Sequence, residues 1–145
     1  MPTLPQRYDY FADDLEEDVL EYEIILRNIN PPGNLANKKR VLRNILAEDR
    51  KYNNSYTSAI SLETELQLVK SKLRSIEDSL QIKNNPRARS RLICLENRII
   101  RAPTANKALK SSLIDQTFSI LKHYFNDNLS VAPNEIAATT EDTNM

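Results

Sequence analysis

Glycine, cysteine, histidine and tryptophan are scarce in this 145-residue chain, which has one glycine, one cysteine, one histidine and no tryptophan. A single glycine cannot build the glycine-rich loops that cradle phosphates in Walker-type and dinucleotide-binding sites. A single cysteine, Cys94, permits neither a disulfide nor a cysteine-based zinc site within one chain. Cys94 lies in an apolar helical stretch, where a packing role is expected, and only His123 could act as its base. These shortages predict a protein that is not an enzyme and binds no metal or cofactor.

Long apolar runs are also missing. No stretch approaches the ~20 apolar residues that a membrane-spanning helix needs. The first residues, MPTLPQRYDYFADD, contain two prolines and become acidic, unlike a secretory signal. Hydrophobic residues make up 40% of the chain and charged residues 28%. This composition predicts an intracellular protein, cytoplasmic or nuclear, with no membrane contact.

Apolar residues recur at three- and four-residue spacing along most of the chain, whereas no segment shows the alternation typical of strands. The sequence therefore predicts an all-α protein of about five helices. Prolines and polar segments divide it into five parts: an extended arm at 1–12, a helical pair at 13–50, a linker at 51–60, a helical hairpin plus a C-terminal helix at 61–128, and a disordered tail at 129–145.

The clearest periodicity lies between residues 62 and 80, where apolar residues step by 4, 3, 4, 3 and 4. This seam consists of Leu62, Leu66, Val69, Leu73, Ile76 and Leu80. A short loop separates its helix from a second apolar helix at about 86–101, which predicts an antiparallel hairpin. Such a heptad seam either joins two copies of the chain or packs inside one bundle. The sequence leaves both alternatives open.

The formal net charge is zero, but the charges are sorted into blocks. Residues 1–34 carry eight acids and two bases, residues 35–52 carry six bases and two acids, and residues 83–110 carry eight bases and one acid. A basic block can attract a phosphate backbone, or it can pair internally with an acidic helix. The candidate nucleic-acid-binding residues are Lys38, Lys39, Arg40, Arg43, Arg87, Arg89, Arg91, Arg98 and Arg101.

Three of these arginines, Arg87, Arg91 and Arg98, are four and seven residues apart, so they share one face of the predicted helix at 86–101, and Arg101 lies close to that face. A basic stripe of this kind can follow the phosphates of RNA or DNA without reading sequence. No aromatic residue is interleaved with the stripe, so sequence-specific recognition of single strands is not expected.

The only glycine, Gly33, follows Pro31 and Pro32 between an acidic and a basic amphipathic helix. It is predicted to form the turn, through a positive φ or a close approach that a Cβ would prevent. This layout resembles the helix–extended turn–helix of SAP-type modules. The matching residues are Leu15, Leu20, Glu23, Leu26, Ile29, Gly33, Lys39, Leu42 and Leu46. The two prolines make a stiffer turn than the SAP pattern has, and a DNA-binding role is what the resemblance implies.

A second resemblance covers residues 10–125. The SAP-like pair, then LETELQLVKSKLRSIEDSL, a short polar loop and RARSRLICLENRIIR are similar in layout to the N-terminal region of Gag-type proteins of arthropod LTR retrotransposons. The resemblance implies a non-enzymatic interaction or self-assembly module of retrotransposon origin. The chain has no zinc knuckle, so RNA packaging through knuckles is not implied. Its expected partner is a second copy of the chain or another helical protein. Two alternatives are left open. The chain is either a helical protein that binds the phosphates of RNA or DNA through the basic stripe of the helix at 86–101, or a helical adaptor that binds another protein.

Overall fold

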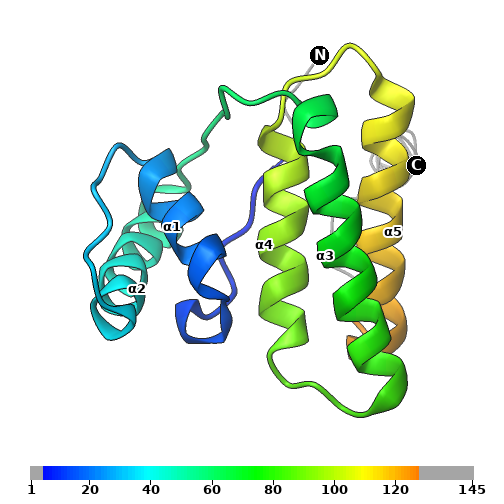
Figure 1. The fold of residues 1–145 in the computed structure, drawn as a ribbon, viewed down its shortest axis with the longest axis horizontal. Coiled ribbons are helices and arrows are strands. Elements are labelled where there is room, and N and C mark those ends of the chain that lie inside the picture. The colour runs from blue at the N-terminus through cyan, green and yellow to red at the C-terminus, as the bar shows by residue number, and fades with distance from the viewer. Residues whose placement is uncertain (1–4, 128–145) are drawn as a thin grey trace, which may run out of the picture.

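The computed structural model describes residues 5–127, and over that range the protein is all-α (Figure 1), as predicted. One short 3₁₀ turn precedes five α-helices. The elements in chain order are η1 (Ala12–Asp14), α1 (Glu17–Leu26), α2 (Leu35–Tyr52), α3 (Leu62–Ile82), α4 (Ala88–Arg101) and α5 (Lys107–Phe125). The predicted disordered tail at 129–145 lies outside the described residues.

α1 and α2 form a pair whose helices run in the same general direction, because the connection between them returns the chain to the start of α1 (Figure 1). At that end, Lys38 Nζ in the first turn of α2 lies 2.7 Å from a carboxylate oxygen of both Glu17 and Glu21. At the opposite end, Arg27 Nη2 lies 2.6 Å from Asp49 Oδ2. The pair is therefore a helix–extended–helix unit and not an antiparallel hairpin.

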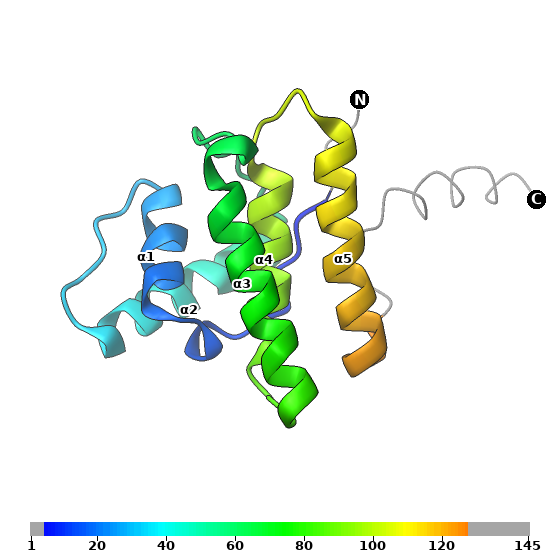
Figure 2. The same cartoon turned by 45° about the vertical axis from the view of Figure 1, so that its right-hand side comes forward.

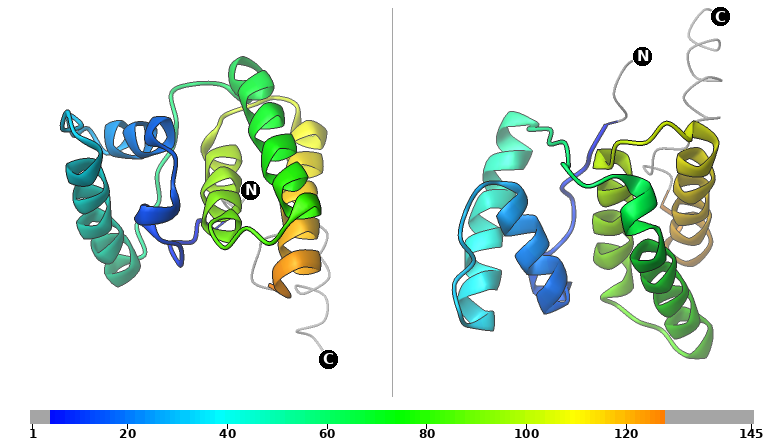
Figure 3. Two further views of the ribbon diagram at one scale, coloured as in Figure 1. Left: turned by 60° about the horizontal axis from the view of Figure 1, so that its bottom comes forward. Right: turned by 45° about the horizontal axis from the view of Figure 1, so that its top comes forward.

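The remaining three helices stand side by side as a bundle (Figure 2), and α4 contacts both of the others. The α1–α2 pair lies against another side of α4, as the two views of Figure 3 show. Twelve of the fourteen residues of α4 are buried, and the exceptions, Arg89 and Arg91, are half-buried. α4 is thus the central helix of the molecule and has no continuous solvent-facing side.

The heptad seam of α3 belongs to the core. Five of its residues are buried, Leu66 is partly buried against the same core, and their partners include apolar residues of α4 and α5. The buried seam residues are Leu62, Val69, Leu73, Ile76 and Leu80. Of the two alternatives left by the sequence, the structure shows the intramolecular one, so the seam is unavailable as an interface between copies.

The N-terminal arm passes between the α1–α2 pair and α4, where it is held through its backbone. The side-chain amide of Asn97 donates to Arg7 O at 2.6 Å and accepts from Arg7 N at 3.1 Å. Tyr8 and Tyr10 are buried, whereas Phe11 is 69% exposed. Residues 1–4 of the predicted arm lie outside the described part of the chain.

Asparagine and serine side chains set several helix ends. The side chains of Asn34, Ser61 and Asn106 each accept a hydrogen bond from a backbone N–H in the first turn of α2, α3 and α5. These bonds satisfy donors that have no partner within the helix. Asn53 and Asn126 follow α2 and α5 in the left-handed conformation, which asparagine tolerates better than most residues.

The first helix is shorter than the sequence predicts. The acids favour a helix that begins near Asp13 or Asp14, but these residues form η1 and the α-helix begins at Glu17. At the other end, Asn28 takes a left-handed φ of 61° just beyond Leu26, so α1 ends ahead of the prolines.

The chain bends at Gly33, but the predicted reason for a glycine at this position is wrong. Its φ is not positive, and no atom lies within 4 Å of the position that a Cβ would take. The left-handed residue in this connection is Asn28, and the rest of the connection is accessible to ordinary residues. A glycine is therefore not needed at position 33.

The predicted linker at 51–60 begins inside α2, which continues to Tyr52. The residues after Tyr52 are held against the fold: Tyr56 Oη donates to Asp49 Oδ1 at 2.6 Å, and Ser58 N donates to Arg101 O at 3.1 Å. These contacts join the connection between the two helical groups to both of them.

Candidate functional site

The structure does not form the predicted basic face on α4, because two of its arginines are buried in ion pairs. Arg98 Nε donates to Glu65 Oε2 at 3.0 Å, its Nη2 pairs with the same oxygen, and its guanidinium lies 3.8 Å from the centroid of the Tyr22 ring. Helical spacing correctly places Arg98 in line with Arg91, but α1 and α3 cover that line. Arg98 cannot reach a phosphate.

Arg101 lies in a buried polar network between α1 and α4. Its side chain is fully buried, Nη1 lies 2.8 Å from Glu23 Oε2, and Nε donates to Gln6 Oε1 at 2.7 Å. Arg27 Nη1 lies 3.1 Å from the other oxygen of Glu23. Burial opposes ionisation of Glu23, but the charges of Arg101 and Arg27 outweigh it and hold the pKa of Glu23 below its usual value. Arg101 is therefore a structural cation, contrary to the prediction.

The remaining arginines of this region are divided between internal contacts and solvent. Arg89 Nη2 lies 2.8 Å from carboxylate oxygens of both Asp9 and Asp127, and Arg91 Nε donates to Asp14 O at 2.8 Å. Arg87 is exposed. Of the predicted candidates in this region, only Arg87, just before α4, has its side chain in solvent without an ion pair among the described residues.

α2 presents its basic residues differently. Lys38 is buried between the acids of α1, so it is also removed from the predicted set. Arg40 and Arg43 are exposed and Lys39 is half-buried. Arg43 Nε has a carboxylate neighbour, Asp13 Oδ1 at 3.4 Å, in a pair whose two side chains are more than half exposed. These three residues remain where a polyanion could contact them.

The sequence prediction missed two further basic residues of α2. Arg50 and Lys51 are exposed on its last turn, at the predicted boundary between the helical pair (13–50) and the linker (51–60). Arg50 Nε donates to Tyr8 O at 2.8 Å and its Nη2 to Tyr10 O at 3.2 Å, so its charge is positioned without being neutralised by a carboxylate. The signal that could have found Arg50 is its place two turns after Arg43, on the same side of a continuing helix.

We call the exposed or half-exposed bases of this helix the α2 stripe, defined as Lys39, Arg40, Arg43, Arg50 and Lys51. Small exposed residues, Ala36, Asn44 and Ala47, lie among them, and Glu48 is the one exposed acid of the helix. Five bases against one acid leave a local charge of +4 on the outward side of an 18-residue helix. Such a face can attract phosphates and lets a backbone approach closely.

The described residues offer little for covalent chemistry. The Cys94 thiol is buried, and burial raises its pKa well above the usual value, so it is held as the unreactive thiol. Within residues 5–127, no group of three or more histidine, cysteine, aspartate or glutamate side chains is arranged to hold a metal ion. The expected packing role of Cys94 agrees with its position in the core.

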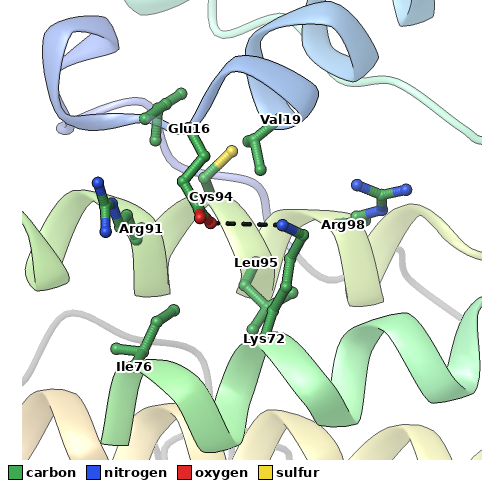
Figure 4. A pocket seen from close by; sticks show the side chains of 9 residues that line it. Glu16, Val19, Lys72, Ile76, Arg91, Cys94, Leu95 and Arg98 are labelled. Carbon is green, nitrogen blue, oxygen red and sulfur yellow. Dashed lines mark hydrogen bonds and ion pairs between the residues drawn. The ribbon is translucent and has the colours of Figure 1, made fainter. Parts of the chain in front are cut away.

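A cavity of about 20 Å³ lies between α1, α3 and α4, with Cys94 at one wall (Figure 4). Val19, Ile76 and Leu95 supply apolar walls, and Lys72 closes one side through a contact of 3.3 Å with Glu16 Oε1. A single water needs roughly 10–15 Å³ of such space. The cavity is therefore a packing gap of water size and not a ligand pocket.

The fold and the α2 stripe define the class of the protein: a small helical module with one basic helix facing outward. No family model, no curated protein and no solved structure matches the chain. Among the described helices, none is long and apolar enough to cross a membrane.

Proposed function

We propose that this protein is a non-enzymatic interaction module that binds nucleic acid through the α2 stripe. The observation that carries the proposal is the contrast between α2 and α4. Arginines of α4 are paired with carboxylates or covered, whereas the stripe keeps five bases on one side of α2 with a single carboxylate, that of Asp13, within ion-pair distance in residues 5–127. Like charges held on one face repel one another, and a phosphate backbone relieves that repulsion.

The arrangement of α1 and α2 supports the same proposal. A parallel helix–extended–helix unit with a basic second helix is the layout that the resemblance to SAP-type modules implies, and DNA binding is the role that goes with it. The turn residue that carried part of the resemblance, Gly33, has no conformational role here. The proposal therefore depends on the charge of α2 and not on the turn.

Kinship with Gag-type proteins stays a prediction. A module that binds RNA or DNA through phosphates would suit such an origin. Self-assembly, the other role implied by that resemblance, loses its predicted surface because the α3 seam is core. Assembly between copies would need a different face.

The test is a binding titration with a fluorescein-labelled, mixed-sequence 20-base-pair DNA duplex, in which fluorescence anisotropy measures the affinity at 50 and at 200 mM KCl. Each neutralised phosphate contributes about −0.9 to the slope of log affinity against log salt, so four to five contacts predict a slope of about −4 and a loss of roughly 200-fold. The triple reversal Arg40→Glu, Arg43→Glu and Lys51→Glu should abolish binding.

The matched control reverses three exposed bases of the α3 region, Lys70→Glu, Arg74→Glu and Lys83→Glu, which changes the net charge by the same amount. These side chains are outside the stripe, so the control should keep most of the affinity, and both variants should keep the helical circular dichroism of the parent. Equal losses in the two variants would mean that net charge, and not the α2 stripe, causes the binding.

A further inference from the structure

We infer that a groove beside the connection between α3 and α4 binds a small phosphate compound, which is either a phosphate monoester or a short polyphosphate. The connection lies at the bottom of Figure 1, and the groove has a volume of about 500 Å³. Three of its eight lining residues are cations, Lys83, Arg87 and Arg91, and none is an acid. The groove contains no residue of the α2 stripe, so the inference does not rest on the proposed function.

No carboxylate of the protein balances these three cations. The chain has no acidic residue from Ser79 to Leu95, and within residues 5–127 no carboxylate lies within ion-pair distance of any of the three. The other arginines of α4 differ, since Arg89, Arg98 and Arg101 each pair with a carboxylate. Like charges that line one groove repel one another, and a multiply charged anion relieves that repulsion.

Arg91 is held so that one edge of its guanidinium stays available. Nε donates to Asp14 O at 2.8 Å, whereas neither of the two amino groups makes a hydrogen bond within residues 5–127. The acid drawn in Figure 4, Glu16, contacts Lys72 instead. The two amino groups of a guanidinium can contact two oxygens of one phosphate at once. Since Arg91 is half-buried and already positioned, binding orders it little further.

Hydrogen bonds within the connection fix one wall of the groove. Asn85 Nδ2 donates to Ser79 Oγ at 3.1 Å, and Asn85 Oδ1 accepts from Arg87 N at 3.1 Å. Ser79 Oγ donates in turn to Ile76 O at 2.7 Å. These bonds join the backbone of Arg87 to the last turns of α3, while its side chain remains in solvent. The wall is therefore formed before any ligand binds.

The charge and size of the groove fit a phosphate compound. A phosphate monoester carries a charge of about −1.5 to −2 at pH 7 and has three acceptor oxygens, whereas a carboxylate carries a single charge. Sites for small molecules have volumes of about 300–1,000 Å³, a range that includes this groove. Ile82, which is 82% exposed, and Pro86 also line it and offer apolar surface to an organic group attached to the phosphate.

The test is isothermal titration calorimetry of the full chain with inorganic triphosphate at 50 mM KCl. Arg87→Gln removes one cation of the groove, and Arg91→Lys keeps the charge but loses the contact with two oxygens. Each should weaken binding by roughly 10- to 100-fold, the effect of one charge-assisted hydrogen bond. The matched control, Arg74→Gln, removes an exposed arginine of α3 that does not line the groove and should bind like the parent.

The two charge-reversal variants of the duplex experiment should respond to triphosphate in the opposite order. The variant of the α2 stripe should keep most of its affinity for triphosphate, because none of its substituted residues lines the groove. Its control variant, which includes Lys83→Glu, should lose affinity for triphosphate while it still binds the duplex. Both variants change the net charge equally, so the difference between them locates the site.

Adenosine triphosphate, the second probe, distinguishes the two sources of phosphate. If it binds more tightly than triphosphate and Ile82→Ser removes only that gain, the ligand is an organic phosphate, whereas equal affinities identify the phosphate chain itself. Equal losses for Arg87→Gln and Arg74→Gln, or no binding by the parent, overturn the inference. Loss of triphosphate binding in the stripe variant alone also overturns it, and leaves the proposed function standing.

Discussion

Substitution of Arg101 by methionine tests whether the buried network, and not a phosphate, is the partner of this arginine. The change removes the 2.8 Å contact of Nη1 with Glu23 and the 2.7 Å hydrogen bond from Nε to Gln6, and methionine occupies much of the same space. Glu23 is left fully buried with a reduced set of partners. We therefore expect a large loss in the free energy of unfolding.

The expected size of the loss depends on the partners that Glu23 keeps. Removing one partner of a buried ion pair costs about 3–5 kcal/mol, since the other charge stays buried and uncompensated. Here Arg27 still lies 3.1 Å from Glu23 Oε1, and Arg101 Nη2 has no hydrogen bond to lose. Both facts place the cost near the lower end, at ~3 kcal/mol, which is measurable by urea denaturation followed by circular dichroism.

Two further variants make the test specific. Arg87→Met changes the same residue type at an exposed position beside the same helix and should alter stability by no more than about 0.5 kcal/mol. The double variant Glu23→Gln and Arg101→Met removes both charges and should be more stable than Arg101→Met alone. A loss for Arg101→Met as small as that for Arg87→Met would refute the buried network and restore Arg101 as a surface cation.

Three other changes have defined outcomes in the same denaturation assay. Leu73→Ala in the buried seam should lower the free energy of unfolding by about 2–5 kcal/mol, whereas Leu68→Ala on the exposed side of α3 should lower it much less. Similar small losses for both variants would contradict the placement of the seam in the core. Gly33→Ala should leave the free energy of unfolding unchanged, whereas Asn28→Ala should lower it by about 1 kcal/mol because alanine resists a left-handed φ. A larger loss for Gly33→Ala than for Asn28→Ala would contradict the assignment of Asn28 as the left-handed residue of this connection. The folded-state pKa of Glu23 is below its unfolded value of about 4.3, so its contribution should be fully present above about pH 5 and decline as the pH falls toward the folded-state pKa; urea midpoints unchanged between pH 7 and pH 3 would disagree.

Local chemistry makes part of the fold predictable. Ser61 is a suitable N-cap in the sequence and begins α3 through a side-chain hydrogen bond, and the regular spacing from Leu62 to Leu80 correctly identifies one apolar face. The short loop before α4 requires an antiparallel hairpin. In each case the determinant lies within a few residues, which is the range that spacing and capping rules describe.

The predicted basic face of α4 is not formed, because spacing shows which side chains share a face but not what covers that face. The acids of the first 34 residues have the pattern of helix N-terminal charge, yet Glu23 reaches Arg101 on α4 and Asp9 reaches Arg89. Internal pairing of the oppositely charged blocks is one of the two alternatives that the sequence leaves open, and the structure shows that pairing. Nothing local distinguishes a buried arginine from an exposed one.

The α2 stripe is only half predictable for a different reason. Its last bases, Arg50 and Lys51, lie at the predicted boundary between the helical pair at 13–50 and the linker at 51–60, whereas α2 continues to Tyr52 and Asn53 follows it in the left-handed conformation. Asparagine occurs throughout this chain, so its presence does not mark a boundary.

Burial of α4 by the N-terminal arm also determines when the protein can complete its fold during synthesis. The contact between Gln6 and Arg101 joins residues 95 positions apart, and Glu23 meets Arg101 across 78 positions. At roughly 5–20 residues per second, the arm waits about 5–20 s for its partner to be made. Until then Glu23 lacks its second cation and Tyr8 and Tyr10 lack the α4 surface. The contacts of the arm and of α1 with α4 therefore form only after α4 has left the ribosome, although the arm and α1 are made first.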